Sequence, residues 1–519
     1  MCGCLLGTFC LLHEYTGLVR QFHATAWLWS GLGPLAAGFR RRGPTARTGC
    51  RIRAPRPPHA QPTMQAKRGV AAELGALGVL AGPIILTQLS QMGMGVVDAI
   101  MAGRVSAVDL AGIALGGNFY WPAMLLLSGI VMSVTPLVSQ MHGAGRETEA
   151  GAVVRQALWI ALAGGLLVVA AMQFGETAYR LIGVDPAAIP VASAYLSAMS
   201  FGLVPVLGYF VLRNLCDGMS WTTPAMVVAL SALALKVPLN YLFVFGGLGI
   251  PAMGGVGCGV SGAIVMWLEF LAMVGVVRFS RVRRAGAFSR FSAPDLRVIW
   301  RLMRLGLPIG IAIFFEVAVF SVVTLLIGRL GVEAVASHQI ASNVGGITFM
   351  VPLALGMAAT IRVGYNVGAD DLPGARRSAF VAVGASAVFA VIAAAVLLWL
   401  RYQIVGAYTT DGAVIDIAAG LLLFVALYQF VDDTQVTAVG ALRGYKDVRA
   451  PMLTALVAYW AIALPLGAAL GFGALGAPWG VEGFWVGLVV GLAVASVVLL
   501  ARLGWLSRNE RRIRMFALG

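Results

Sequence analysis

Charged residues are scarce in this chain of 519 residues. Asp, Glu, Lys and Arg make up 11% of it, whereas hydrophobic residues make up 59%. Because soluble globular domains carry about 25% charged residues, this composition excludes a soluble fold and predicts an all-α protein that crosses a membrane several times. The formal net charge of +15 does not indicate nucleic-acid binding, since the basic residues lie between hydrophobic segments, where they orient the spans in the bilayer.

The sequence also lacks the patterns that would indicate an enzyme or a cofactor site. It contains no zinc-binding or nucleotide-binding motif and no nucleophile placed beside a base. The six cysteines have no spacing typical of a disulfide framework or a metal site: Cys2, Cys4, Cys10, Cys50, Cys216 and Cys258. We therefore expect neither an enzyme nor a bound cofactor.

Residues 1–66 differ from the rest of the chain because they are rich in Arg and Pro and contain one acid, Glu14. We expect this extension to be disordered. A signal peptide is rejected, because His13 and Glu14 interrupt the apolar stretch that it would need. A transit peptide and upstream sequence translated from a wrongly assigned start both fit the composition. We favour the second, with Met64 as the natural start.

Twelve hydrophobic segments from there onward are long enough to cross about 30 Å of hydrocarbon. Eight Lys or Arg residues fall in the loop 278–304, whereas the loops on the opposite side hold only four in total. The positive-inside rule therefore predicts that both termini are cytoplasmic. The approximate cores of the segments are 75–100, 110–138, 153–174, 189–212, 223–245, 257–277, 305–327, 335–361, 378–400, 416–441, 450–472 and 482–503.

An internal repeat divides these segments into two groups of six. A shift of 225 positions places Pro83 on Pro308 and Gly143 on Gly368, and it also aligns Asn118 with Asn343. An even number of spans separates the copies, so both have the same orientation, as in transporters built from parallel repeats. The predicted parts are an N-lobe at 67–277, a basic cytoplasmic linker at 278–304, a C-lobe at 305–503 and a cytoplasmic tail at 504–519.

Three of the acids inside apolar segments are the main candidates for a functional site, because a carboxylate there costs roughly 2.5–3.5 kcal/mol on insertion scales and usually marks an ion, proton or substrate path. They are Glu316, Asp98 and Asp432, and none has an adjacent Lys or Arg. Tyr428 and Gln435 share a helical face with Asp432, whereas Asp433 points about 100° away. We predict that Glu316, Asp432 and Tyr428 form a cation-coupling site for Na⁺ or a shared proton, with Asp98 as a further coupling residue. Structural acids paired with a neighbouring helix are the alternative.

A polar stripe with the spacing of one helix face runs through the first segment and leads to Asp98. A methionine beside the stripe suits a surface that fits many apolar shapes, although methionine at this spacing more often reflects ordinary packing. Lys236 is a candidate charge partner for one of the acids, and a lysine reaching the membrane surface is the alternative. The predicted substrate-cavity residues are Gln88, Gln91, Met94, Asn118, Asn343, Gln339 and Gln435.

At these residues the chain resembles the multidrug and toxic compound extrusion (MATE) family, in its bacterial NorM-like branch. The resemblance covers about 70 to 505 and rests on GMGVVDAIMAG, the Glu of the seventh span, YQFVDDTQV with ALRGYKD, and GGVGCGVSGAIVMW. It implies a V-shaped pair of six-helix lobes in a bacterial inner membrane. It also implies Asp98 in an N-lobe site and Glu316, Tyr428 and Asp432 in a C-lobe cation site. Lys236 and the doublet of Asp432 and Asp433 depart from the family pattern.

Three functions compete on these observations. The first is a monomeric antiporter that exports organic cations or drugs through the lipid bilayer in exchange for Na⁺ or H⁺. The second is a flippase for lipid-linked precursors, which should have a more cationic cavity than one buried Lys236 provides. The third is a passive channel, which would give the asymmetric acids no role. The sequence favours the antiporter.

Overall fold

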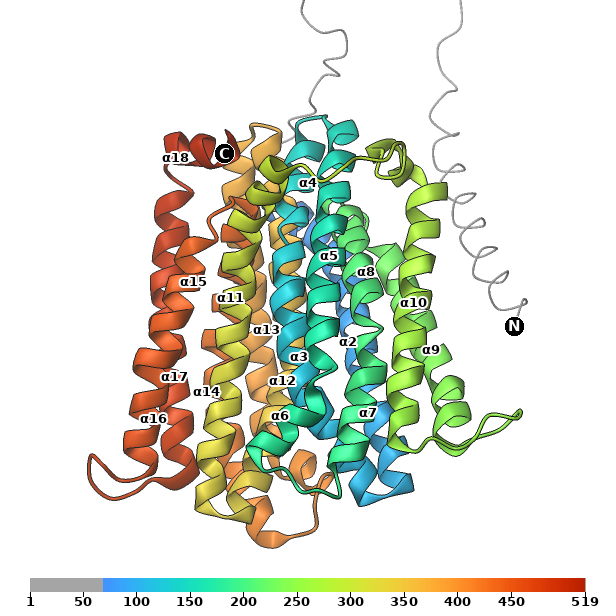
Figure 1. The fold of residues 1–519 in the computed structure, drawn as a ribbon. Helices are drawn as coiled ribbons and strands as arrows, with labels where there is room; N and C mark the ends of the chain where they lie inside the picture. Colours follow the sequence, from blue (N-terminus) through green and yellow to red (C-terminus); the bar gives the residue numbers. More distant parts are fainter. Residues whose placement is uncertain (1–68, 519) are drawn as a thin grey trace, which may run out of the picture. The chain divides into compact units, whose positions relative to one another are not determined.

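The computed structural model describes residues 69–518, which form helices joined by loops (Figure 1). The extension predicted at residues 1–66 lies outside the described residues. The first half of the helices comprises α2 (Val70–Val105), α3 (Ala107–Val131), α4 (Val134–Gly143), η2 (Glu147–Glu149), α5 (Ala150–Met172), α6 (Gly175–Ile182), α7 (Ile189–Ser200), α8 (Leu203–Gly218), α9 (Thr223–Phe245), α10 (Gly255–Phe279) and η3 (Arg281–Ala285).

The second half begins with α11 (Leu296–Ile327) and has the same order of long helices. It comprises α11, η4 (Gly328–Leu330), α12 (Val332–Gly368), α13 (Leu372–Gly406), α14 (Gly412–Gly444), α15 (Arg449–Ala455), the π-helix η5 (Leu456–Ala463), α16 (Leu464–Gly471), α17 (Gly480–Leu506) and α18 (Glu510–Leu518).

The helices agree with the predicted spans. Within residues 69–518, eleven helical segments are long and apolar enough to cross a membrane, and the bent pair α7 and α8 makes a twelfth if it is one span. The bend between these two helices is 43°. It falls on the fourth predicted span, at the break between Ser200 and Leu203. The prediction of an all-helical membrane protein is therefore confirmed.

The predicted repeat appears as a reciprocal contact between the two halves. A Cβ placed on Gly143, at the end of α4, would lie 1.9 Å from the Tyr365 carbonyl oxygen of α12. A Cβ placed on Gly368, at the end of α12, would lie 2.0 Å from the Gln140 carbonyl oxygen of α4. Gly143 and Gln140 are the residues that the shift of 225 aligns with Gly368 and Tyr365. The two helix ends thus approach each other closely through symmetry-related glycines.

Polar contacts join the two halves at the same end of the molecule. The Arg362 guanidinium of α12 donates from Nε and Nη2 to the two Glu73 carboxylate oxygens of α2, at 2.9 and 2.8 Å. Ser378 of α13 donates to the same carboxylate at 2.6 Å. Gln140 Nε2 donates to the Gly444 carbonyl at 3.0 Å. We call this end, where α4, α12 and α14 finish and α2 and α13 begin, the basic end.

Helix α18 lies at the basic end, at the upper left of Figure 1 above α17. Its Arg514 pairs with Asp370 at 3.1 Å, and Lys446 Nζ donates to the Ala517 carbonyl at 3.1 Å. Ile513 is buried and belongs to the core of the second half, which also contains Leu77 and Ile84 from α2. The first turns of α2 therefore pack with helices of the second half.

Candidate functional site

The first polar cluster surrounds Asp98, which is buried on α2. Asn240 of α9 donates from Nδ2 to Asp98 Oδ1 at 2.7 Å, and Lys236 Nζ lies 3.0 Å from the same oxygen. These two residues are four apart on α9 and therefore project from one face of that helix. Although no basic residue is adjacent to Asp98 in the sequence, the packing of α9 against α2 provides one in space.

Helix α10 completes the cluster around Lys236. Lys236 Nζ donates to the Cys258 carbonyl and to Ser261 Oγ, each at 3.2 Å, and Ser261 also donates to Asn240 Oδ1. An ammonium group has three protons to donate, and Asp98, Cys258 and Ser261 supply three acceptors. Lys236 is 2% exposed, so it does not reach the membrane surface. The cluster holds a buried, mutually compensated ion pair.

The polar stripe on α2 has a different environment at each position. Gln88 accepts a hydrogen bond from Arg213 Nη2 at 3.1 Å, and Arg213 Nε lies 3.5 Å from Asp217 in the buried interior of the first half. Gln91 and Met94 are partly exposed. Gln88 is thus engaged with a buried arginine of α8, which no sequence pattern indicated.

The second polar cluster contains the two acids predicted to couple a cation. Glu316 of α11 is partly exposed, and Asp432 of α14 is buried. The two carboxylates are close enough to interact electrostatically, and the Tyr428 hydroxyl lies beside Asp432. Asp432 Oδ1 has no hydrogen-bond partner among residues 69–518. In contrast to Asp98, Asp432 has no Lys or Arg within ion-pair distance in the described chain. Arg443 interacts with Glu316 at longer range.

Two further residues of this cluster come from the π-helix η5, and sequence reasoning missed both. Tyr459 is buried there and interacts with Glu316 and Asp432. Trp460 donates from Nε1 to the Phe315 carbonyl at 3.1 Å, one residue before Glu316. π-Helical turns often occur at functional sites. The adjacent Tyr and Trp in the eleventh span could have indicated a functional position. The π-turn that directs them toward α11 could not be predicted from the sequence.

The remaining predicted residues lie apart from the carboxylates or beside the second cluster. Gln435 is buried and lies near Tyr459. Gln339 and Asn343 are exposed on α12 and hydrogen-bond to each other at 3.4 Å, and Asn118 is exposed on α3. Within the described part of the chain, no hydrogen bond or ion pair connects these last three residues to either carboxylate cluster.

Asp433 lies on a different face of α14 from Asp432. Its backbone carbonyl accepts hydrogen bonds from Ser386 of α13 at 2.8 Å and from Thr437 at 2.9 Å, and its side chain lies near Gln429. Over residues 69–518, no three His, Cys, Asp or Glu side chains are grouped so as to hold a metal ion. An ion at the second cluster would therefore need the neutral oxygens of Tyr428, Tyr459 or Gln435 besides the two carboxylates.

Comparison with known proteins identifies the family. The MatE family model matches twice, over residues 83–242 and 308–469. The chain belongs to the MATE family of multidrug transporters. The two matched segments begin at Pro83 and Pro308, which is the register of the internal repeat. Asp98 and Lys236 lie in the first segment, and Glu316, Asp432 and Tyr459 lie in the second.

Relatives of this MATE transporter match most of its length. Multidrug resistance protein PmpM of Pseudomonas aeruginosa is 45% identical over 456 residues, which are 87% of this chain and 95% of that protein. Multidrug resistance protein MdtK of Photorhabdus laumondii is 40% identical, over 85% of this chain and 97% of its own. The crystal structure of the eukaryotic MATE transporter AtDTX14 superposes with a TM-score of 0.78 at 20% identity, covering 86% of this chain and 99% of that one. The MATE fold predicted from the sequence is confirmed.

Proposed function

We propose that this MATE transporter exports amphipathic organic cations and drugs in exchange for H⁺ or Na⁺, with Glu316 and Asp432 as the coupling site. The observation that carries the proposal is the pairing of these two acids inside the membrane-spanning helices, where Asp432 Oδ1 lacks a hydrogen-bond partner among residues 69–518. The relatives PmpM and MdtK are multidrug resistance proteins, which supports the substrate class.

The chemistry of the second cluster supports a role in coupling. Two neighbouring carboxylates in a medium of low dielectric constant repel each other, and a bound proton or Na⁺ relieves that repulsion. The Tyr428 hydroxyl and the Tyr459 hydroxyl can supply neutral oxygens to the ion. Because Trp460 ties η5 to α11, a change in ion occupancy at Glu316 would be transmitted to the packing of these helices.

The first cluster supports a separate role in the first half. Asp98 is compensated by Lys236, so a cationic substrate would compete with Lys236 for the carboxylate. The same ion pair argues against the lipid-linked precursor flippase, because a compensated Lys236 offers no open positive charge to a phosphate group. Asp98 therefore remains a candidate for substrate binding rather than for a second coupling site of the Glu316 type.

The location and assembly that accompany this function are also proposals. The basic end carries the linker and α18, and by the positive-inside rule this supports a cytoplasmic location for that end and for both termini in a bacterial cell. The membrane is then the inner membrane, and one chain supplies both polar clusters, which is consistent with a functional monomer.

The test is dye efflux from proteoliposomes under separately imposed H⁺ and Na⁺ gradients. Glu316→Gln and Asp432→Asn should each remove most of the ion-driven efflux, and the double variant should lose little more, because groups that act as a unit are not additive. Asp433→Asn, on another face of α14, is the matched control and should be much milder. Additive losses, or greater damage from Asp433→Asn than from Asp432→Asn, would show that the coupling carboxylates are assigned wrongly.

A further inference from the structure

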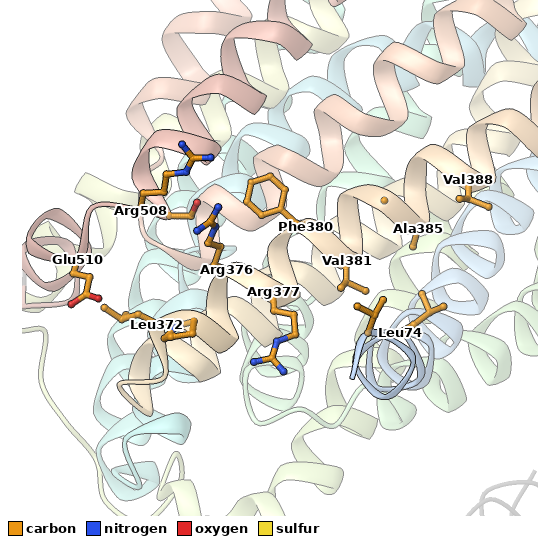
Figure 2. A pocket seen from close by; sticks show the side chains of 14 residues that line it. Leu74, Leu372, Arg376, Arg377, Phe380, Val381, Ala385, Val388, Arg508 and Glu510 are labelled. Carbon is orange, nitrogen blue, oxygen red and sulfur yellow. The ribbon is translucent and has the colours of Figure 1, made fainter. Parts of the chain in front are cut away.

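A groove of about 1200 Å³ runs along α13 at the basic end, between α2 and the link from α17 to α18. Figure 2 shows Arg376 and Arg508 at one end of this groove and Val381, Ala385 and Val388 following along α13. Val388 is 62% exposed, so the apolar part of the groove opens to the outer surface of the helices. In a membrane that surface faces lipid.

The charge at the mouth of the groove is predominantly positive. Arg376, Arg377 and Arg508 line it, and Glu510 is the one acid among the lining residues. Docking of α18 through Arg514 and Asp370 fixes the link that carries Arg508. A basic mouth above an apolar channel matches the two parts of an anionic phospholipid, because the arginines suit its phosphate and the channel suits an acyl chain.

The corresponding surface of the first half is covered by the protein itself. On α5, Arg155, Gln156 and Trp159 donate hydrogen bonds to the carbonyl oxygens of Gly286, Ala293 and Ser292, respectively, in the segment between η3 and α11, at 2.6, 2.9 and 3.0 Å. The linker thus lies on α5 at these three positions.

The shift of 225 aligns Arg155, Gln156 and Trp159 with Phe380, Val381 and Gly384, which line the groove on α13. These side chains have no hydrogen-bonding groups, and a Cβ on Gly384 would meet nothing within 4 Å. Among residues 69–518, the second half therefore leaves open the surface that the first half covers.

We propose that this groove is a binding site for an anionic phospholipid of the leaflet at the basic end. The phosphate lies between Arg376 and Arg508, and an acyl chain follows α13 past Gly384. Because Leu74 of α2 lines the groove together with α13, the lipid contacts both halves of the transporter. It does so directly beside the contact of Glu73 with Arg362 and Ser378.

The test compares phosphatidylglycerol with phosphatidylcholine bound to the full-length chain by native mass spectrometry. The wild-type protein should retain phosphatidylglycerol preferentially, and Arg376→Gln and Arg508→Gln should each lower that retention roughly fivefold. Gly384→Leu, which changes no charge, should lower it by filling the channel. Arg297→Gln is the matched control, because Arg297 is exposed at the start of α11 and lies outside the groove.

Three results would overturn the proposal. The first is equal retention of the two lipids, and the second is an equal loss of retention in Arg376→Gln and in the Arg297→Gln control. The third is displacement of phosphatidylglycerol by millimolar inorganic phosphate, which would show an anion site that takes no acyl chain. Retention that survives phosphate but is lost in Gly384→Leu supports the lipid site.

Discussion

Replacing Glu73 by Gln should shift the molecule away from the conformation in which the two halves meet at the basic end. The side chains of Glu73 and Arg362 are 5% and 14% exposed and form a two-point contact. Removing one charge of a buried pair costs roughly 3–5 kcal/mol. We expect a smaller cost of about 2 kcal/mol here, because Arg362 keeps some solvent contact and the amide of the introduced glutamine can still accept a hydrogen bond. This corresponds to roughly a 30-fold change in the conformational equilibrium.

The assay is electron–electron double resonance between spin labels at Thr148 and Pro373 in a cysteine-free background. These exposed positions are equivalent in the repeat and lie in different halves at the basic end. The Glu73→Gln variant should show an additional population at longer distance. The charge swap Glu73→Arg with Arg362→Glu should restore part of the short-distance population. A folded Glu73→Gln protein with the wild-type distribution would refute the assignment of this pair to inter-half closure.

Further predictions concern the two polar clusters and the tail. Asp98→Asn or Lys236→Gln alone should lower thermal stability more than the double variant does, because each single change leaves a buried charge without its partner. Equal or additive losses of stability would contradict this. Trp460→Phe should weaken the affinity for the coupling ion roughly fivefold, because one hydrogen bond is lost. The measurement is the ion concentration that gives half-maximal efflux. An unchanged affinity would exclude a role of η5 in ion coupling. Burial, and then Arg301, lower the pKa of Lys446 to about 8. The cost of charging Lys446 in the folded state is therefore present below pH 8 and declines as the pH rises toward about 10.5. The wild-type protein should therefore gain melting temperature between pH 8 and about 10.5, and Lys446→Met should lack this gain. Parallel pH profiles of the two proteins would contradict a lowered pKa of Lys446.

The repeat made much of the fold predictable from the sequence. Pro83 and Pro308 mark the same place in the two halves, and the helices follow the predicted spans because long apolar runs must satisfy their backbone hydrogen bonds internally. The bend between α7 and α8 was not predicted. It depends on packing of the two short helices, which hydropathy does not report.

The candidate site was predictable only where the chemistry depends on residue type. A carboxylate such as Glu316 stands out in an apolar segment, whichever helix lies beside it. The pairing of Asp98 with Lys236 remained one of two alternatives, because it depends on how α2 and α9 pack. Tyr459 was missed because a π-turn sets its direction, and the contact of Glu73 with Arg362 joins residues 289 positions apart.

The reciprocal contact of Gly143 and Gly368 has an evolutionary consequence. A contact in which each partner presents the same residue to the same place on the other is isologous, the kind that a two-fold homodimer makes. Each half of this chain is thus shaped to bind a copy of itself in parallel orientation. Because the two halves are joined in one chain, they need not be identical, and the acids at positions 98 and 316, which have no acidic counterparts across the repeat, are such differences.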